Sequence, residues 1–126
     1  MNQSLSGDLR RRVARFYRDI DSNDREAFSR WLTGDAVFVF NDTDPATGPA
    51  AIDDFVSTWK AGFTSVTHQI VATVVDGENA CVAVELIVRY AFHSGREVTL
   101  RGCSFLDFAD DLISGWRVYL DTTRLS

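Results

Sequence analysis

The sequence is poor in cysteine, proline and lysine, and it contains no long hydrophobic run. Its 126 residues include two cysteines, two prolines and one lysine, Lys60, against twelve arginines. Cys81 and Cys103 lack the spacing of metal ligands, and a two-residue turn at Ser94-Gly95 would set Cys81 opposite position 108, so no disulfide between them is expected. No metal or organic cofactor is implied by the sequence. No apolar stretch approaches the ~18 residues of a membrane span, and residues 1–7 lack the apolar centre of a signal peptide. We therefore expect a cytoplasmic protein without a membrane partner.

The charge pattern argues against binding to nucleic acid. The formal net charge is −5, and apart from Arg10–Arg12 the basic residues are spread along the chain. A nucleic-acid binder needs a basic patch or stripe. A chain of this length can bury one core and is too short for two of ordinary size. We expect a single domain over residues 1–126, with residues 1–7 as a loose N-terminal arm.

Hydrophobic spacing predicts helices in the first half of the chain and strands in the second. Helices are expected over about residues 8–21, from Asn23 to Gly34 behind a capping box with Glu26, and from Pro49 to Gly62. Strands are expected over residues 36–40, 65–75, 81–93, 97–108 and 113–122. Helices ahead of a meander predict an α+β fold, with the helices packed on one face of a mostly antiparallel sheet.

The strand over residues 81–93 alternates between an apolar and a mixed face. A two-residue turn at Asp76-Gly77 would set His68 opposite Glu85, and a two-residue turn at Ser94-Gly95 would set Glu85 opposite Ser104. The mixed face would also hold small residues, Ala83, Ala91 and Gly102. Small side chains around an ionisable pair indicate a small-molecule pocket, unless aromatic side chains from the helices fill it.

The sequence allows two registers for the last strand. A two-residue turn at Asp110-Asp111 would send Arg117, Tyr119 and Asp121 to the pocket face. A bulged turn would instead send Trp116, Val118 and Leu120 there.

Residues 112–121, LISGWRVYLD, resemble the last strand of the limonene epoxide hydrolase family, typically written KITGWRDYFD. The order of elements also resembles the SnoaL-like and nuclear transport factor 2-like superfamily. That resemblance implies three helices and a curved sheet forming a cone with a pocket at its open end. The epoxide hydrolase Arg, Asp, Asp set would fall on Glu85, Ile87 and Val118, so its activity is not expected. The resemblance also implies that Asn41 takes the place of that family's water-binding Asn.

Several residues are candidates for the site. We expect His68 to act as a base or acid and Glu85 to orient it, the alternative being a pair that only satisfies its own hydrogen bonds. Arg89 could bind an acidic substrate group or pair with Glu85. Tyr17 could donate a hydrogen bond to a ligand oxygen, as a Tyr does in related ketosteroid isomerases, or belong to the core. The expected pocket walls are Trp59, Trp116 and Val118.

The expected function is therefore binding of an apolar small molecule, with acid/base chemistry on it such as isomerisation, cyclisation, dehydration or hydrolysis. The alternatives are a ligand-binding protein without catalysis and an assembly subunit. The apolar face of the strand, with Val82, Val84, Leu86, Val88, Tyr90, Cys103 and Phe105, is too apolar to face water. Related folds dimerise through the outer sheet face, so we expect a homodimer formed through this surface.

Overall fold

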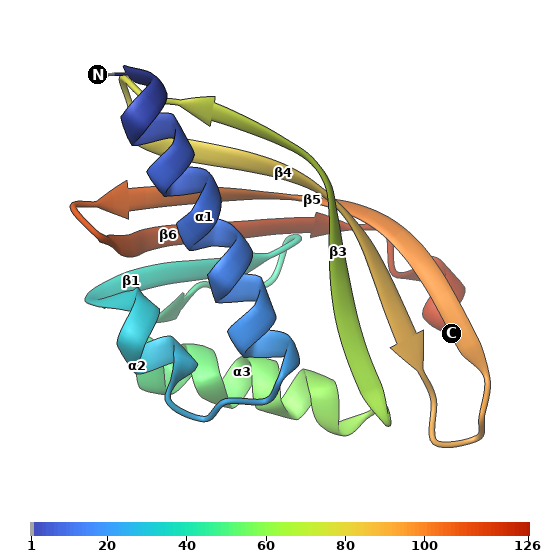
Figure 1. The fold of residues 1–126 in the computed structure, drawn as a ribbon. Helices are drawn as coiled ribbons and strands as arrows, with labels where there is room; N and C mark the ends of the chain where they lie inside the picture. Colours follow the sequence, from blue (N-terminus) through green and yellow to red (C-terminus); the bar gives the residue numbers. More distant parts are fainter. Residues whose placement is uncertain (1) are drawn as a thin grey trace.

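The computed structural model describes the backbone of residues 2–126 and the side chains of residues 7–126. Three helices and six strands form most of this part of the chain (Figure 1). The elements in order are α1 (Asn2–Asp21), α2 (Ala27–Trp31), β1 (Leu32–Phe40), β2 (Ala46–Thr47), α3 (Pro49–Ala61), β3 (Ser65–Asp76), β4 (Cys81–Ala91), β5 (Glu97–Ala109), β6 (Leu112–Leu120) and the short 3₁₀ helix η1 (Thr123–Leu125).

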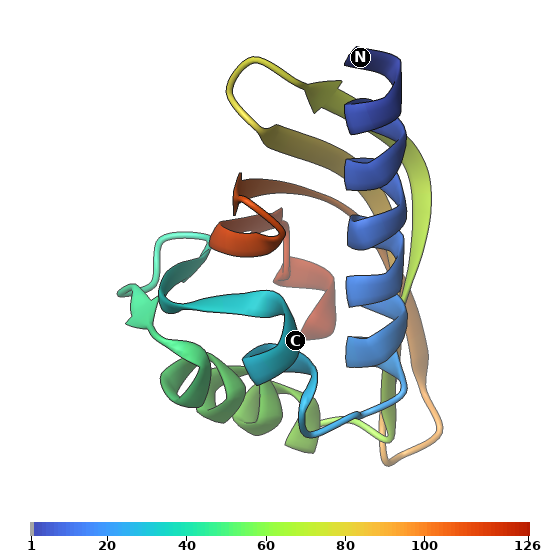
Figure 2. The same ribbon diagram turned by 60° about the vertical axis from the view of Figure 1, so that its left-hand side comes forward.

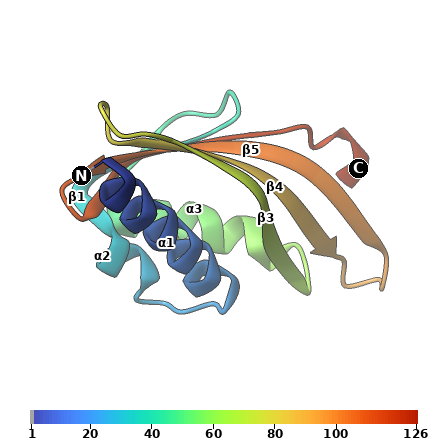
Figure 3. The same cartoon turned by 45° about the horizontal axis from the view of Figure 1, so that its top comes forward.

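The six strands form one curved sheet in the order β2-β1-β6-β5-β4-β3. Strands β1 and β6 pair in parallel, and every other neighbouring pair is antiparallel. All three helices lie on the same, concave face of the sheet (Figure 3). The predicted α+β fold is thus confirmed.

Helix α1 runs along this face, as the turned view in Figure 2 shows. Its predicted apolar stripe is buried, with exposed fractions of 3% or less at Leu9, Val13, Phe16, Tyr17 and Ile20. The helix begins at Asn2 and not near Asp8, so residues 2–7 continue α1.

The start of α2 differs from the predicted capping box. Asn23 has a φ of 60°, and its Oδ1 accepts a hydrogen bond from Lys60 Nζ at 3.0 Å. Asp24 Oδ1 accepts the backbone N–H of Glu26 at 3.0 Å in its place. The helix therefore begins later, at Ala27, and Asn23 connects the α1–α2 loop to α3.

The apolar face of β4 is the core face of the sheet and not a surface for dimerisation. Val82, Val84, Leu86, Val88 and Tyr90 are each at most 3% exposed beneath the helices. The mixed face, with Glu85 and Arg89 exposed, is the outer one. Burying the apolar face under α1 removes it from water within one chain, so the apolar pattern needs no second copy.

Two irregularities account for the changed cross-strand pairs. The β3–β4 loop has four residues, which alone would keep His68 and Glu85 on one face, but a bulge follows at Val71 between the pairs Ala72–Glu85 and Ile70–Leu86. One extra residue moves His68 opposite Val88, so the predicted His68–Glu85 pair is wrong.

The β4–β5 turn adds a second shift. Phe92 N–H donates to Arg96 O at 2.8 Å, which closes a three-residue turn ending at Gly95 with a φ of 93°. Glu85 consequently faces Cys103 instead of Ser104, and Ile87 faces Arg101 instead of Gly102. The predicted two-residue turn at Ser94-Gly95 is therefore also wrong.

The last hairpin combines both alternatives left open by the sequence. Asp110 and Asp111 form a two-residue turn, with Asp110 at a φ of 54°. An irregularity at Ser114 then shifts the pairing by one residue, between Phe108–Ile113 and Asp107–Gly115. Trp116, Val118 and Leu120 therefore belong to the concave face, while Asp121 lies beyond the strand and accepts the backbone N–H of Thr123.

Candidate active site

A mostly apolar cavity lies between the concave face of the sheet and helices α1 and α3. Aromatic and aliphatic side chains form most of its wall, among them Phe38, Phe40, Phe55, Leu86 and Val88. The volume open to the centres of water molecules is about 60 Å³. Since one water needs roughly 10–15 Å³ by this measure, the cavity has room for a few waters or a small organic group.

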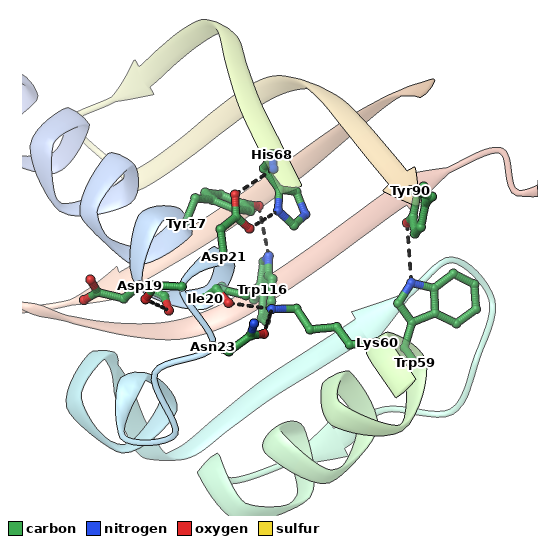
Figure 4. A network of polar contacts seen from close by, with 11 residues as sticks. Tyr17, Asp19, Ile20, Asp21, Asn23, Trp59, Lys60, His68, Tyr90 and Trp116 are labelled. Atoms are coloured by element: carbon green, nitrogen blue, oxygen red, sulfur yellow. Dashed lines mark hydrogen bonds and ion pairs between the residues drawn. The ribbon is translucent and has the colours of Figure 1, made fainter. Parts of the chain in front are cut away.

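His68 and Asp21 form a hydrogen-bonded pair at the wall of this cavity (Figure 4). His68 Nδ1 lies 2.6 Å from Asp21 Oδ1, and the backbone N–H of His68 donates to Asp21 Oδ2 at 2.7 Å. Both side chains are largely buried, with 16% of His68 and 18% of Asp21 exposed. The carboxylate thus fixes both the ring and the strand that carries it.

This pairing determines which ring nitrogen is available for chemistry. A carboxylate accepts hydrogen bonds, so the neutral imidazole carries its hydrogen on Nδ1 and leaves a lone pair on Nε2. Nε2 has no hydrogen-bond partner among residues 7–126, and in Figure 4 the ring edge away from Asp21 faces the side where Trp59 and Tyr90 lie. His68 Nε2 therefore keeps a lone pair that is free to accept a hydrogen bond at the cavity wall.

Asp21 is the last residue of α1, an end at which a helix disfavours negative charge. Lys60 of α3 offsets this cost, because its ammonium group donates to the carbonyl of Ile20 and to Asn23 Oδ1. Burial lowers the pKa of Lys60, while the nearby negative charge of Asp21 acts in the opposite direction. The single lysine therefore holds the end of α1 where Asp21 meets His68.

Tyr17, Trp116 and Ser104 form a second polar group at the cavity. Trp116 Nε1 donates a hydrogen bond to Tyr17 Oη at 3.2 Å, and burial raises the pKa of Tyr17 to about 12. Ser104 is fully buried, and its hydroxyl has no partner of acceptable geometry among the described residues, although it lies near the Tyr17 phenol. An unpartnered buried hydroxyl costs about 1–3 kcal/mol.

Trp59 and Tyr90 repeat the same arrangement elsewhere in the cavity. Trp59 Nε1 donates to Tyr90 Oη at 3.4 Å, and burial raises the pKa of Tyr90 as well. Both tyrosines thus stay protonated at neutral pH and keep a hydroxyl hydrogen to donate.

The structure brings five of the eight sequence-predicted site residues to this cavity, namely Tyr17, Trp59, His68, Trp116 and Val118. Glu85 and Arg89 lie on the outer face, where Glu85 Oε2 is 3.9 Å from Arg101. Neither can orient His68 or bind a ligand in the cavity. The predicted Glu85 role is therefore replaced by that of Asp21.

Asn41 has a structural position outside the cavity wall. Its side chain donates to Leu120 O and accepts from Leu120 N, both at 2.8 Å, which joins the end of β1 to β6. Asn41 is therefore held by the backbone of β6 and does not line the cavity, where the resemblance implied a water-binding role.

Sequence reasoning missed Asp21, Lys60 and Tyr90 as site residues. Asp21 lies 47 positions from His68, and no periodic pattern links a helix end to a strand at that separation. One available signal was an Asp in the last turn of a helix, which is unfavourable without a partner. Lys60 was visible only as the sole lysine.

Comparison with known proteins agrees with this fold. Residues 13–116 match the model of the SnoaL-like domain, and the chain therefore belongs to the SnoaL-like family. No curated protein matches the sequence.

Solved structures of low sequence identity share the fold. A proposed SnoaL-like polyketide cyclase from Jannaschia sp. CCS1 superposes with a TM-score of 0.84 at 18% identity, covering 94% of this chain and 89% of its own. TerC, crystallised with polyporic acid, also has a TM-score of 0.84, at 14% identity, covering 94% of this chain and 95% of its own. An LEH-like epoxide hydrolase from M. tuberculosis has a TM-score of 0.77 at 20% identity, covering 92% and 84%.

The epoxide hydrolase set has no counterpart on the inner side of β4. The alignment from sequence assigned two of its positions to Glu85 and Ile87, which lie on the outer face. The inward residues of β4 are uncharged throughout, from Val82 to Tyr90.

Among the described residues, no group of three His, Cys, Asp or Glu side chains is arranged to hold a metal ion. No helix in the same part of the chain is long and apolar enough to cross a membrane.

Proposed function

We propose that this protein is an acid/base enzyme that moves a proton on an apolar small molecule held in the cavity. His68 Nε2 is the proton acceptor and donor, and Asp21 orients the ring. The observation that carries the proposal is the 2.6 Å contact between His68 Nδ1 and Asp21 Oδ1 at the wall of an apolar cavity.

The chemistry follows from the charges that the pair can stabilise. When Nε2 takes a proton from the substrate, the ring becomes an imidazolium, and the adjacent Asp21 carboxylate stabilises its positive charge. The same ring can then return the proton to another atom of the substrate. Removal and return at different positions accomplish an isomerisation, and the same transfers support cyclisation or dehydration.

The surroundings support a small apolar substrate. The cavity wall is mainly aromatic and aliphatic, and the structural neighbours include a protein crystallised with polyporic acid and a proposed polyketide cyclase. A dry wall also strengthens the interaction between the substrate's developing charge and the polar groups that face it.

Proton exchange in heavy water tests the proposal directly. Apolar ketones with exchangeable hydrogens would be incubated with the protein, and deuterium uptake would be followed by NMR. We expect wild type to accelerate exchange of at least one ketone, and His68→Ala to lose about 10²–10⁴-fold of that rate.

The second histidine provides the matched control. His93 contacts Ala61 O and Thr64 Oγ1 and is absent from the cavity wall, so His93→Ala should keep the wild-type rate. Equal exchange by wild type and His68→Ala would contradict the proposal. Tight binding of ketones without any exchange would instead support a ligand-binding protein without catalysis.

A further inference from the structure

Lys60, on α3, borders two hollow spaces at once. One is the apolar cavity, and the other is a polar cleft between the α1–α2 loop, α3 and the start of β3, with about 440 Å³ open to the centres of water molecules. Ile20, Val56 and Val66 also line both spaces. Lys60 is therefore part of the wall between the cavity and the cleft, and it is the polar member of the four shared residues.

The hydrogen bonds of Lys60 suit a neutral amine. Nζ contacts two acceptors, Ile20 O and Asn23 Oδ1, across the gap between α3 and the end of α1 (Figure 4). The ammonium group and the neutral amine can both make these two bonds, but only the neutral amine then keeps a lone pair at its remaining position. Among residues 7–126, Nζ has no third hydrogen-bond partner. A molecule in the cavity or the cleft can therefore meet the nitrogen there.

No carboxylate holds Lys60 in its charged form. Within residues 7–126 Lys60 forms no salt bridge, and the acids near it have partners of their own. Asp24 pairs with Arg30 at 2.9 Å, and both oxygens of Asp21 bind His68. Burial lowers the pKa of Lys60, and the charge of Asp21 opposes this effect only in part. A desolvated lysine without an ion pair is a common form of amine nucleophile in proteins.

The type of residue matters as well as its position. Lys60 is the single lysine of the chain, whereas the other basic positions hold twelve arginines. An arginine has five N–H donors and could also bind the carbonyl of Ile20, but its guanidinium group stays protonated and cannot act as a nucleophile. Holding the end of α1 therefore does not by itself explain a lysine at this position.

We infer that Lys60 is an amine nucleophile that forms an imine with small apolar aldehydes entering the cavity. This inference goes beyond the proposed proton transfer by His68 and does not depend on it. The mainly apolar wall favours the reaction, because imine formation releases a water molecule that such a wall does not hold.

The reaction balances without an oxidant or a reductant. The Nζ lone pair attacks the carbonyl carbon, a carbon–nitrogen bond forms, and the carbonyl π pair moves onto oxygen. A proton then passes from the nitrogen to this oxygen, which gives a carbinolamine. The hydroxyl group leaves as water together with the second hydrogen of the nitrogen, and the carbon–nitrogen double bond remains. One water is formed for each imine.

Reductive trapping in one protein compares Lys60 with an exposed lysine. The variant Arg89→Lys adds a second lysine on the outer face of β4, at an exposed position. The folded variant would be incubated with isobutyraldehyde and sodium cyanoborohydride, whose hydride converts an imine into a stable amine. Tandem mass spectrometry would follow the adduct at each lysine. We expect trapping at Lys60 to be about tenfold faster than at the introduced lysine, because burial leaves more of its amine neutral.

Two controls relate this reactivity to the fold and to the cavity. In concentrated urea the two lysines should react at similar rates, because the cavity and the cleft no longer exist. Glyoxylate, an aldehyde that carries a carboxylate, should show little preference for Lys60 in the folded protein, since the apolar wall disfavours its charge.

Equal trapping at the two lysines of the folded protein, or slower trapping at Lys60, would overturn the inference. A preference for Lys60 that persists in urea, or that is as large with glyoxylate, would overturn it as well. Proton exchange of ketones is measured separately. Normal trapping without exchange would contradict only the proposed function, and exchange without trapping would contradict only the role of Lys60.

Discussion

Replacing Asp21 by asparagine should reverse the tautomer of His68 while keeping its shape. Asp21 uses one oxygen for the His68 ring and the other for the His68 backbone N–H. Asparagine has a single oxygen. If it keeps the buried backbone N–H, its amide NH₂ faces Nδ1, and two donors cannot share that contact. The ring must then carry its hydrogen on Nε2, which removes the proton acceptor from the cavity.

The size of both effects can be worked out from the structure. Loss of a charge-assisted hydrogen bond costs about 1.5–3 kcal/mol, and removing a negative charge from the end of α1 returns about 0.3–1 kcal/mol. We therefore expect Asp21→Asn to lower the free energy of unfolding by about 1–2 kcal/mol. Proton exchange should fall about 10²–10⁴-fold, because general-base catalysis by Nε2 is lost.

Two assays separate these effects. Urea denaturation gives the change in stability, and deuterium uptake into the ketone gives the rate. Asp19→Asn is the matched control, because Asp19 binds Arg30 and Trp31 and does not line the cavity. It should lose stability and keep the exchange rate. Wild-type exchange by Asp21→Asn would refute the role of the carboxylate.

Three further predictions concern stability and assembly. The pKa of Tyr17 is raised from 10.0 to about 12, so its protonated form adds about 3 kcal/mol to the free energy of unfolding below pH 10. This stabilisation is lost as pH rises through about 12. Tyr17→Phe should therefore make the free energy of unfolding depend less on pH in the alkaline range. Asn41→Ala should cost about 2–4 kcal/mol in urea denaturation, through two lost hydrogen bonds. The homodimer stays a prediction, for which light scattering should give a mass of twice 14.1 kDa. Tyr119 is exposed on the outer face of the sheet, and Tyr119→Glu should reduce the measured mass to that of one chain.

The sequence predicted the fold well because hydrophobic period depends on local backbone geometry. The stripe of α1 and the alternation of β4 each follow from which side chains share a face, and both are present. The face assigned to the pocket was wrong, because the helices cover the apolar face of β4 and not the mixed one. The predicted cross-strand pairs were also wrong, since register depends on single-residue irregularities. Val71 at a bulge and Gly95 in a three-residue turn each shift the pairing by one, and neither is marked by an unusual composition.

The site was predicted only in part, for a related reason. Residues of the cavity wall such as Trp59 and Trp116 could be found from apolar spacing, because they also belong to the core. The Asp21–His68 pair depends on how the end of α1 crosses β3, which is a matter of tertiary packing. The apolar face of β4 could have indicated where the cavity lies. An apolar strand face is excluded from water, so it is the face that the helices cover.

The tautomer of His68 is the most direct test of the role assigned to Asp21. Long-range ¹H–¹⁵N correlation spectra would be recorded on ¹⁵N-labelled wild type at a pH where the ring is neutral, with His93→Ala to assign the signals. Hydrogen on Nδ1 and a bare Nε2 is the expected result, with the reverse in Asp21→Asn. Hydrogen on Nε2 in the wild type would contradict the proposal that this nitrogen accepts the substrate's proton.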